Sequence, residues 1–97
     1  MFDIDSAECG LGWHPIIERF QRRLDALNMR RDAPISIVDA KEKHGRLRLD
    51  LSPFDGEAWN LAMEAEHESR TTCETCGGPG EIKVERDILK CRCAECP

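Results

Sequence analysis

The sequence predicts an α+β fold: a small helix–hairpin–helix body over residues 1–72, followed by a shorter hairpin between two cysteine pairs over residues 73–97. Three observations lead to this prediction. Apolar residues recur at helical spacing in two segments, they alternate at strand spacing between those segments, and five of the six cysteines follow residue 72. Because a chain of 97 residues buries only a thin core, we expect the two parts to pack as one unit.

The first helix is expected from about residue 15 to residue 29. Pro15 suits the first helical turn, where a missing N–H costs nothing. One apolar face is formed by Ile16, Ile17, Phe20, Leu24 and Leu27. Trp13 opens this helix, and we expect it in the core rather than as a stacking platform.

A β-hairpin should follow the first helix. Residues 35–40 are rich in β-branched side chains, and residues 46–51 alternate strictly between polar and apolar. The apolar positions expected to face the helices are Leu47, Leu49 and Leu51. Residues 41–45 should join the strands, with Gly45 free to take a positive φ.

The second helix is expected from about residue 53 to residue 70. Ser52 is placed to cap its N–H groups, Pro53 suits its first turn, and Asp55 favours the positive end of its dipole. The predicted core stripe is Phe54, Ala58, Leu61, Ala62 and Ala65, flanked by Trp59 and Met63. We expect Trp59 in the core as well.

The C-terminal cysteines carry the strongest chemical indication. Two Cys-x-x-Cys pairs are separated by sixteen residues, and four thiolates at this spacing can close a tetrahedron around one Zn²⁺. The predicted ligands are Cys73, Cys76, Cys93 and Cys96. Residues 81–85 and 88–92 alternate like two short strands around Arg86-Asp87. Because this knuckle–hairpin–knuckle layout is that of a zinc ribbon, we predict one structural zinc per chain.

Two further cysteines need an assignment. Cys91 competes with Cys93 and Cys96 for two ligand positions. The single residue between Cys91 and Cys93 forms a poorer metal-binding turn than the two residues between Cys93 and Cys96. We therefore expect Cys91 to be spare. Cys9 is distant in the sequence, and we expect a free, partly buried thiol there.

The composition of the chain restricts the cellular compartment and the kinds of partner that we expect. The first residues are acidic and lack the basic and apolar regions of a secretory signal, and no apolar run approaches the roughly 20 residues that span a bilayer. We expect a cytoplasmic protein with reduced cysteines and no membrane partner. A net charge of −5 disfavours general affinity for DNA, which depends on phosphate neutralisation.

A basic cluster is the second candidate site. Its members are Lys41, Lys43, Arg46 and Arg48 of the predicted hairpin, with Arg22 and Arg23 nearby if the first helix packs alongside. Such a cluster is suited to phosphate or to an acidic partner. The alternative is a solvated turn whose charges pair internally with Glu64 or Glu66.

Three stretches resemble small, uncharacterised bacterial and phage proteins that have a C-terminal zinc ribbon. They are Gly12-Trp-His-Pro-Ile-Ile, Lys41-Glu-Lys-His-Gly-Arg-Leu-Arg48, and Ala65-Glu66-x-x-Ser69 leading to Cys73-Glu-x-Cys76-Gly-x-Pro-Gly80. Similar proteins commonly end in Cys-x-x-His and have Thr at the position of Cys91. The resemblance implies that Cys93 and Cys96 are the ligands. It brings no established activity.

The sequence favours binding over catalysis. Four cysteines would fill the coordination shell of a zinc ion, the three histidines show no ligand or nucleophile spacing, and there is no phosphate-binding glycine loop. We expect a protein partner, as for an adaptor or a phage-type inhibitor, and no small-molecule substrate. The alternative is a nucleic acid bound by the basic hairpin, assisted by Lys83, Arg86, Lys90 and Arg92.

Overall fold

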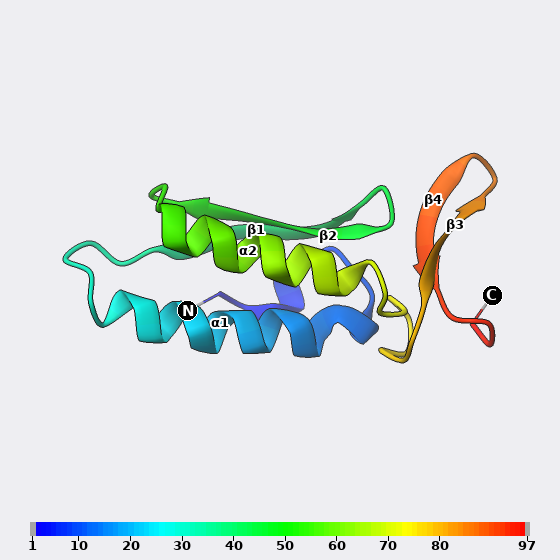
Figure 1. Cartoon of the computed structure of the whole chain (residues 1–97), viewed down its shortest axis with the longest axis horizontal. Helices are drawn as coiled ribbons and strands as arrows, with labels where there is room; N and C mark the ends of the chain where they lie inside the picture. The colour runs from blue at the N-terminus through cyan, green and yellow to red at the C-terminus, as the bar shows by residue number, and fades with distance from the viewer. Residues whose placement is uncertain (1, 97) are drawn as a thin grey trace.

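The fold is a mixed α+β arrangement of two helices and two small antiparallel sheets (Figure 1). It comes from a computed structural model that describes residues 2–96. The elements are the short 3-10 turns η1 (Ile4–Ser6) and η2 (Leu11–Trp13), α1 (His14–Asn28), β1 (Ser36–Lys43), β2 (Arg46–Ser52), α2 (Gly56–Ser69), β3 (Glu81–Glu85) and β4 (Ile88–Arg92). The prediction of an α+β class with a C-terminal cysteine cluster is confirmed.

Helix α1 lies where the apolar periodicity placed it. Its buried residues are Ile16, Ile17, Phe20, Leu24 and Leu27, and Pro15 lies in its first turn. Trp13 is completely buried, and its indole N–H donates to the carbonyl oxygen of Thr72 over 2.8 Å. The core position predicted for Trp13 is therefore confirmed, and its polar atom is satisfied.

The first hairpin is longer than predicted. Residues 41–43 belong to β1 rather than to a loop, so the connection is only His44-Gly45. Both residues have positive φ, 55° and 84°. Two-residue turns of this kind match the right-handed twist of the flanking strands, which allows pairing to continue to Lys43 and Arg46. Leu47 is buried, and Leu49 and Leu51 pack against the core as expected.

Helix α2 begins later than predicted, and a different residue caps it. Ser52 ends β2, whereas the Asp55 side chain accepts the N–H of Ala58 over 3.1 Å. The prediction that Phe54 and Trp59 lie in the core is wrong, because they are 81% and 50% exposed.

The buried face of α2 is made of small side chains: Ala58, Ala62, Ala65 and Ser69. Small residues let α2 approach α1 and β2 closely, and the helix contacts both elements. Trp59 follows Ala58 by one position, which is about 100° around a helix. Its side chain therefore lies at the margin of the buried face of α2.

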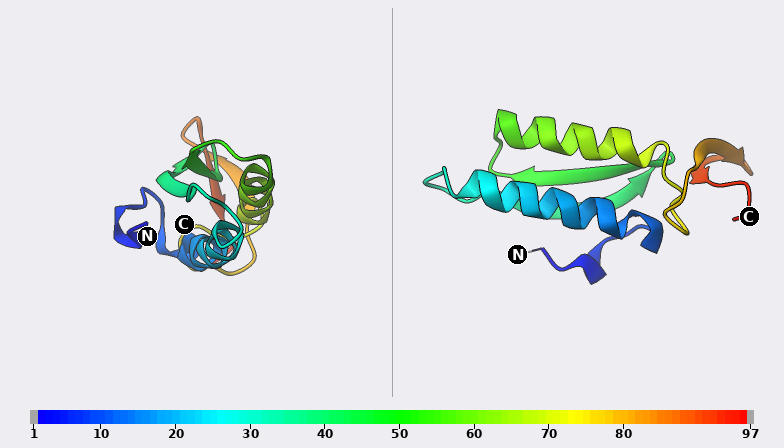
Figure 2. Two further views of the ribbon diagram at one scale, coloured as in Figure 1. Left: turned by 90° about the vertical axis from the view of Figure 1, so that its left-hand side faces the viewer. Right: turned by 60° about the horizontal axis from the view of Figure 1, so that its bottom comes forward.

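A single core lies between α1, α2, the first hairpin and the N-terminal segment, which surround it when the molecule is viewed along its length (Figure 2). The N-terminal segment covers the outer edge of β1. There the N–H of Glu8 donates to the carbonyl of Ala40 over 2.8 Å, and the N–H of Glu42 donates to the carbonyl of Glu8 over 3.0 Å. The backbone groups of Ala40 and Glu42 on this edge of the sheet are thereby paired.

The β3–β4 hairpin lies at one end of an elongated molecule of 45 × 21 × 20 Å (Figure 1). Its two strands pair around Arg86-Asp87, as predicted. The turn of the first hairpin packs on it: a Cβ at Gly45 would lie 3.2 Å from the Cγ2 atom of Ile82. The Lys90 Nζ atom lies 3.3 Å from a carboxylate oxygen of Glu42. Neither described helix is long and apolar enough to cross a membrane.

Candidate metal centre

The first cysteine pair lies on a tight turn directly after α2. The N–H of Cys73 donates to the carbonyl of Gly78 over 2.7 Å, and the N–H of Gly77 donates to the carbonyl of Cys73 over 2.9 Å. Gly77 has a φ of 82°, a value that glycine adopts without strain. This geometry aims the N–H of Gly78 at the Cys76 sulfur, 3.5 Å away. We refer to this turn, residues 73–78, as the first knuckle.

The β3–β4 hairpin brings the second pair to the first. Arg86 and Asp87 have φ values of 50° and 66°, so the chain reverses in two residues and β4 returns alongside β3. Residues 93–96 follow β4 directly and lie beside the first knuckle. The spacing of sixteen residues between the pairs is thus the length of one short hairpin.

The four sulfurs of Cys73, Cys76, Cys93 and Cys96 form one cluster. All lie within 4.8 Å of one another, and the Cys76 and Cys93 sulfurs are 3.7 Å apart. All four are free cysteines. A tetrahedral zinc site with Zn–S bonds of about 2.3 Å has sulfur–sulfur edges of about 3.8 Å. The cluster therefore has the dimensions of a four-thiolate metal site.

Burial, backbone N–H groups and hydrogen bonds among the four thiols shift their pKa values in both directions. Burial opposes ionisation of Cys73, but the N–H groups of Cys76, Cys93 and Thr75 outweigh it and lower the pKa of this thiol to about 6. A hydrogen bond with Cys96 lowers the pKa of Cys93. Hydrogen bonds with Cys93 and Cys76 raise the pKa of Cys96 to about 12. Because a metal binds the thiolate form, metal binding at this cluster should release the protons that these thiols hold.

Cys91 lies outside the cluster, as predicted. Its side chain is completely buried in the core, and its S–H faces the carbonyl oxygens of Arg70 and Thr72 at 3.3 and 3.1 Å. Desolvation raises the pKa of this thiol, which remains a protonated donor rather than a thiolate ligand.

Cys9 is a free, partly buried thiol, also as predicted. Burial, followed by the charges of Glu74 and Glu42, raises its pKa to about 11.

Glu74 is the residue of this site that sequence reasoning missed. It lies between the first two cysteines and is buried. Its carboxylate accepts the N–H of Gly10 over 2.9 Å and lies 3.1 Å from the Nη1 atom of Arg92. Its backbone N–H donates to the carbonyl of Cys91 over 3.1 Å, and its carbonyl accepts the N–H of Gly12 over 2.7 Å. One residue thus joins the first knuckle to β4 and to the N-terminal segment.

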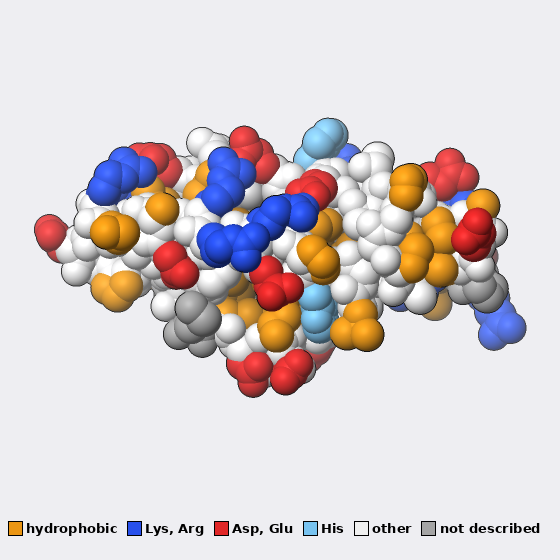
Figure 3. All heavy atoms as spheres, turned by 90° about the horizontal axis from the view of Figure 1, so that it is seen from below, with side chains coloured by type: hydrophobic (Ala, Val, Ile, Leu, Met, Phe, Trp, Pro, Cys, Tyr) orange, Lys and Arg blue, Asp and Glu red, His pale blue; other side chains and the backbone are white. Residues whose placement is uncertain are grey.

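The structure brings together only the hairpin part of the predicted basic cluster, where Lys41 lies opposite Arg48 and Lys43 lies opposite Arg46. Three hairpin cations lie near carboxylates: Lys41 at 3.3 Å from Asp39, Arg48 at 3.2 Å from Asp50 and Arg46 at 3.6 Å from Glu66. The α1 residues lie apart from this hairpin: Arg23 pairs with Glu64 over 2.7 Å, and Arg22 lines a hollow with Phe2 and Ile4. Basic and acidic side chains lie beside one another on the face that α1 presents (Figure 3).

The arrangement offers four soft sulfur ligands to one cation. Comparisons of the chain with protein-family models, curated proteins and solved structures find no match. The conclusions about this site therefore rest on its geometry and its donor chemistry.

Proposed function

We propose that this chain is a non-enzymatic zinc protein that acts by binding another protein, as an adaptor or a phage-type inhibitor. The observation that carries the zinc part of this proposal is the four-sulfur cluster, with all ligand atoms within 4.8 Å of one another. In this account β3, β4 and the two flanking knuckles form a zinc ribbon, and the metal is structural.

Zinc is the metal that the donor set favours. Four thiolates in a tetrahedron are typical of structural Zn²⁺ sites, whereas harder cations prefer oxygen ligands. The N–H of Gly78 next to the Cys76 sulfur stabilises the negative charge that such a site carries. A catalytic zinc needs an open coordination position, which four cysteines do not leave.

A protein partner fits the exposed side chains better than a nucleic acid does. Val84 and Ile88 on the β3–β4 hairpin are 69% and 54% exposed, and apolar side chains appear at that end of the molecule in Figure 3. Exposed apolar groups of this kind favour contacts with proteins.

The cations of the ribbon also favour a protein partner. Lys83, Lys90 and Arg92 each lie within 4.0 Å of a carboxylate, which reduces the positive charge available to phosphates. A nucleic-acid role for hairpin 41–48 remains the alternative.

The proposal is tested by affinity capture with the zinc-loaded chain and with Cys76→Ser, each from a nuclease-treated lysate. We expect one protein to be retained at a fixed ratio by the zinc-loaded chain only. Retention should persist at about 0.3 M salt, because apolar contacts are not screened. Capture of nucleic acid from an untreated lysate, released by the same salt, would support the alternative instead.

A further inference from the structure

Glu8 pairs with the middle of the outer edge of β1, whereas the outer edge of β2 has no such backbone partner among the described residues. Because the turn contains two residues, Lys43 and Arg46 form a hydrogen-bonded pair. Along the strands from this pair, hydrogen-bonded and non-hydrogen-bonded residue pairs alternate. Leu47 and Leu49 consequently direct their N–H and C=O groups away from β1.

The side chains of α2 close only the first of these two positions. The N–H of Leu47 donates to the Ser69 Oγ atom over 2.9 Å. Within residues 2–96, no residue outside the sheet hydrogen-bonds to the backbone of Leu49. The edge is therefore available for a further strand.

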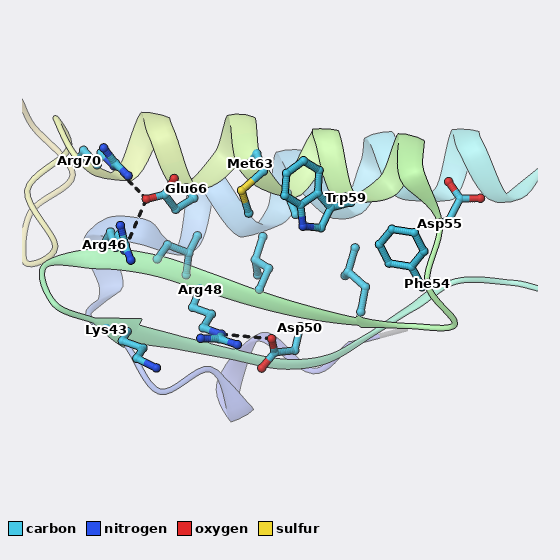
Figure 4. Close-up of a pocket in the computed structure, with 14 residues that line it drawn as sticks. Lys43, Arg46, Arg48, Asp50, Phe54, Asp55, Trp59, Met63, Glu66 and Arg70 are labelled. Atoms are coloured by element: carbon cyan, nitrogen blue, oxygen red, sulfur yellow. Dashed lines mark hydrogen bonds and ion pairs between the residues drawn. The ribbon is translucent and has the colours of Figure 1, made fainter.

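A groove of about 410 Å³ runs along this open edge, between β2 and α2. Trp59 and Met63 extend from α2 toward β2, and Phe54 lies at the start of the helix (Figure 4). These three side chains are 50%, 38% and 81% exposed. Leu49 and Leu51 complete the apolar lining. The groove thus combines unpaired backbone groups with exposed aromatic and aliphatic surface.

The end of the groove nearest the His44-Gly45 turn is basic. Lys43, Arg46 and Arg70 lie there, together with a single carboxylate, Glu66, which is shared between Arg46 at 3.6 Å and Arg70 at 2.8 Å (Figure 4). Lys43 makes no ion pair with the side chains that the structure describes. A ligand with a carboxylate at this end would meet unbalanced positive charge.

We propose that this groove binds an extended segment of a partner protein, which adds to the sheet as a third strand beside β2. Backbone groups of the segment pair with Leu49, its apolar side chains contact Trp59 and Met63, and an acidic side chain lies near Lys43. Strand addition takes its affinity from backbone hydrogen bonds and its selectivity from alternate side chains. This inference rests on the proposed function, since it names the kind of segment that the protein would recognise.

The test uses a displayed library of random ten-residue peptides, selected on the zinc-loaded chain. We expect the enriched sequences to alternate apolar residues and to contain an acidic residue at one end. A synthetic peptide of the enriched sequence should slow hydrogen exchange at the Leu49 amide. Methylation of the peptide nitrogens that face β2 should abolish binding, because it removes the hydrogen bonds of the added strand.

Three variants locate the site. Trp59→Ala should weaken binding of the enriched peptide by at least about tenfold, as expected for an exposed aromatic anchor. Lys43→Glu should weaken binding and reduce its dependence on salt. Met29→Ala, which removes an 88% exposed side chain outside the groove, should leave binding unchanged.

The inference is overturned if selection on the wild-type chain, with Trp59→Ala as the counter-selection target, enriches no peptide sequence. It is also overturned if the enriched peptides bind equally well after methylation of their backbone nitrogens. A concentration-dependent dimer that protects Leu49 without peptide would assign the edge to a second copy of the chain. A protein partner captured equally well by wild type and Trp59→Ala would refute the groove while leaving the proposed function standing.

Discussion

The N–H of Gly12 donates to the carbonyl oxygen of Glu74 over 2.7 Å, so the N-terminal segment lies directly on the first knuckle. No side chain fits between them. A Cβ at Gly12 would lie 2.2 Å from the carbonyl oxygen of Cys73 and 2.6 Å from that of Glu74. The metal centre and the start of α1 are therefore parts of one packed unit, and a substitution that disrupts the packing of one should destabilise the other.

Gly12→Ala should strongly destabilise the protein. The added methyl group would meet backbone atoms, which cannot rotate away, so the cost should reach about 3 kcal/mol, the upper end of typical overpacking penalties. Chemical denaturation measures this free energy of unfolding.

Gly56→Ala is the matched control. Nothing lies within 4 Å of a Cβ at Gly56, the first residue of α2. Alanine there should raise the free energy of unfolding by about 0.4–1 kcal/mol, because it reduces the conformational entropy of the unfolded chain. Equal effects of the two substitutions would contradict the close packing at Gly12.

Glu74→Ala should destabilise the contact between the first knuckle and the N-terminal segment. It leaves the Arg92 guanidinium and the Gly10 N–H without their carboxylate, and we expect a loss of about 2–3 kcal/mol. Hydrogen exchange at Gly10 should become faster. Glu81→Ala, whose carboxylate lies 4.0 Å from Lys83 on an exposed strand, should change neither quantity. Unaltered exchange at Gly10 in Glu74→Ala would refute this role.

Asp55→Ala should destabilise the start of α2 at neutral pH, whereas Ser52→Ala should have little effect. Hydrogen bonds from Arg31 and from the N–H of Ala58 lower the pKa of Asp55. A carboxyl whose pKa is lowered by folding stabilises the protein when the pH is above its pKa in the unfolded chain, about 4. This stabilisation is lost as the pH falls through the pKa of the carboxyl in the folded protein. The difference from wild type should therefore shrink in acid. Urea unfolding at several pH values would reveal it, and a greater loss for Ser52→Ala would restore Ser52 as the cap.

The Cys9 thiol should resist alkylation at pH 8. Because its pKa is raised to about 11, it is almost entirely protonated at that pH, and only the thiolate reacts. Its rate should increase about tenfold for each pH unit up to that value. Peptide mapping after treatment with iodoacetamide would measure the rate. Reaction of Cys9 at pH 8 as fast as that of a free peptide thiol would contradict the burial of this side chain.

Local patterns made α1 and the cysteine cluster predictable. The apolar spacing placed the first helix within one residue of its observed bounds, His14–Asn28. The two cysteine pairs and the short hairpin between them lie within 24 residues, so sequence spacing alone brings the sulfurs together. The spare position of Cys91 also followed from local geometry.

Features that depend on distant packing were not predictable. The contact between Glu74 and Gly10 spans 64 residues, and no pattern in the sequence marks it. Helical spacing placed Phe54 in the predicted core stripe with Trp59 beside it, but α2 uses its alanines to approach α1 and β2. The polar residues 41–43 were expected in a loop, yet cross-strand pairing extends to Lys43 because the turn needs only two residues.

The most direct test of the zinc-ribbon account is native mass spectrometry of the wild-type chain beside Cys76→Ser and Cys91→Ser. The account predicts one zinc per chain in the wild type, none in Cys76→Ser, and one in Cys91→Ser. Hydrogen exchange of β3 and β4 should accelerate in Cys76→Ser, because the stability of such a segment comes largely from metal binding. Zinc retained by Cys76→Ser, or lost from Cys91→Ser, would contradict the assignment of the four ligands.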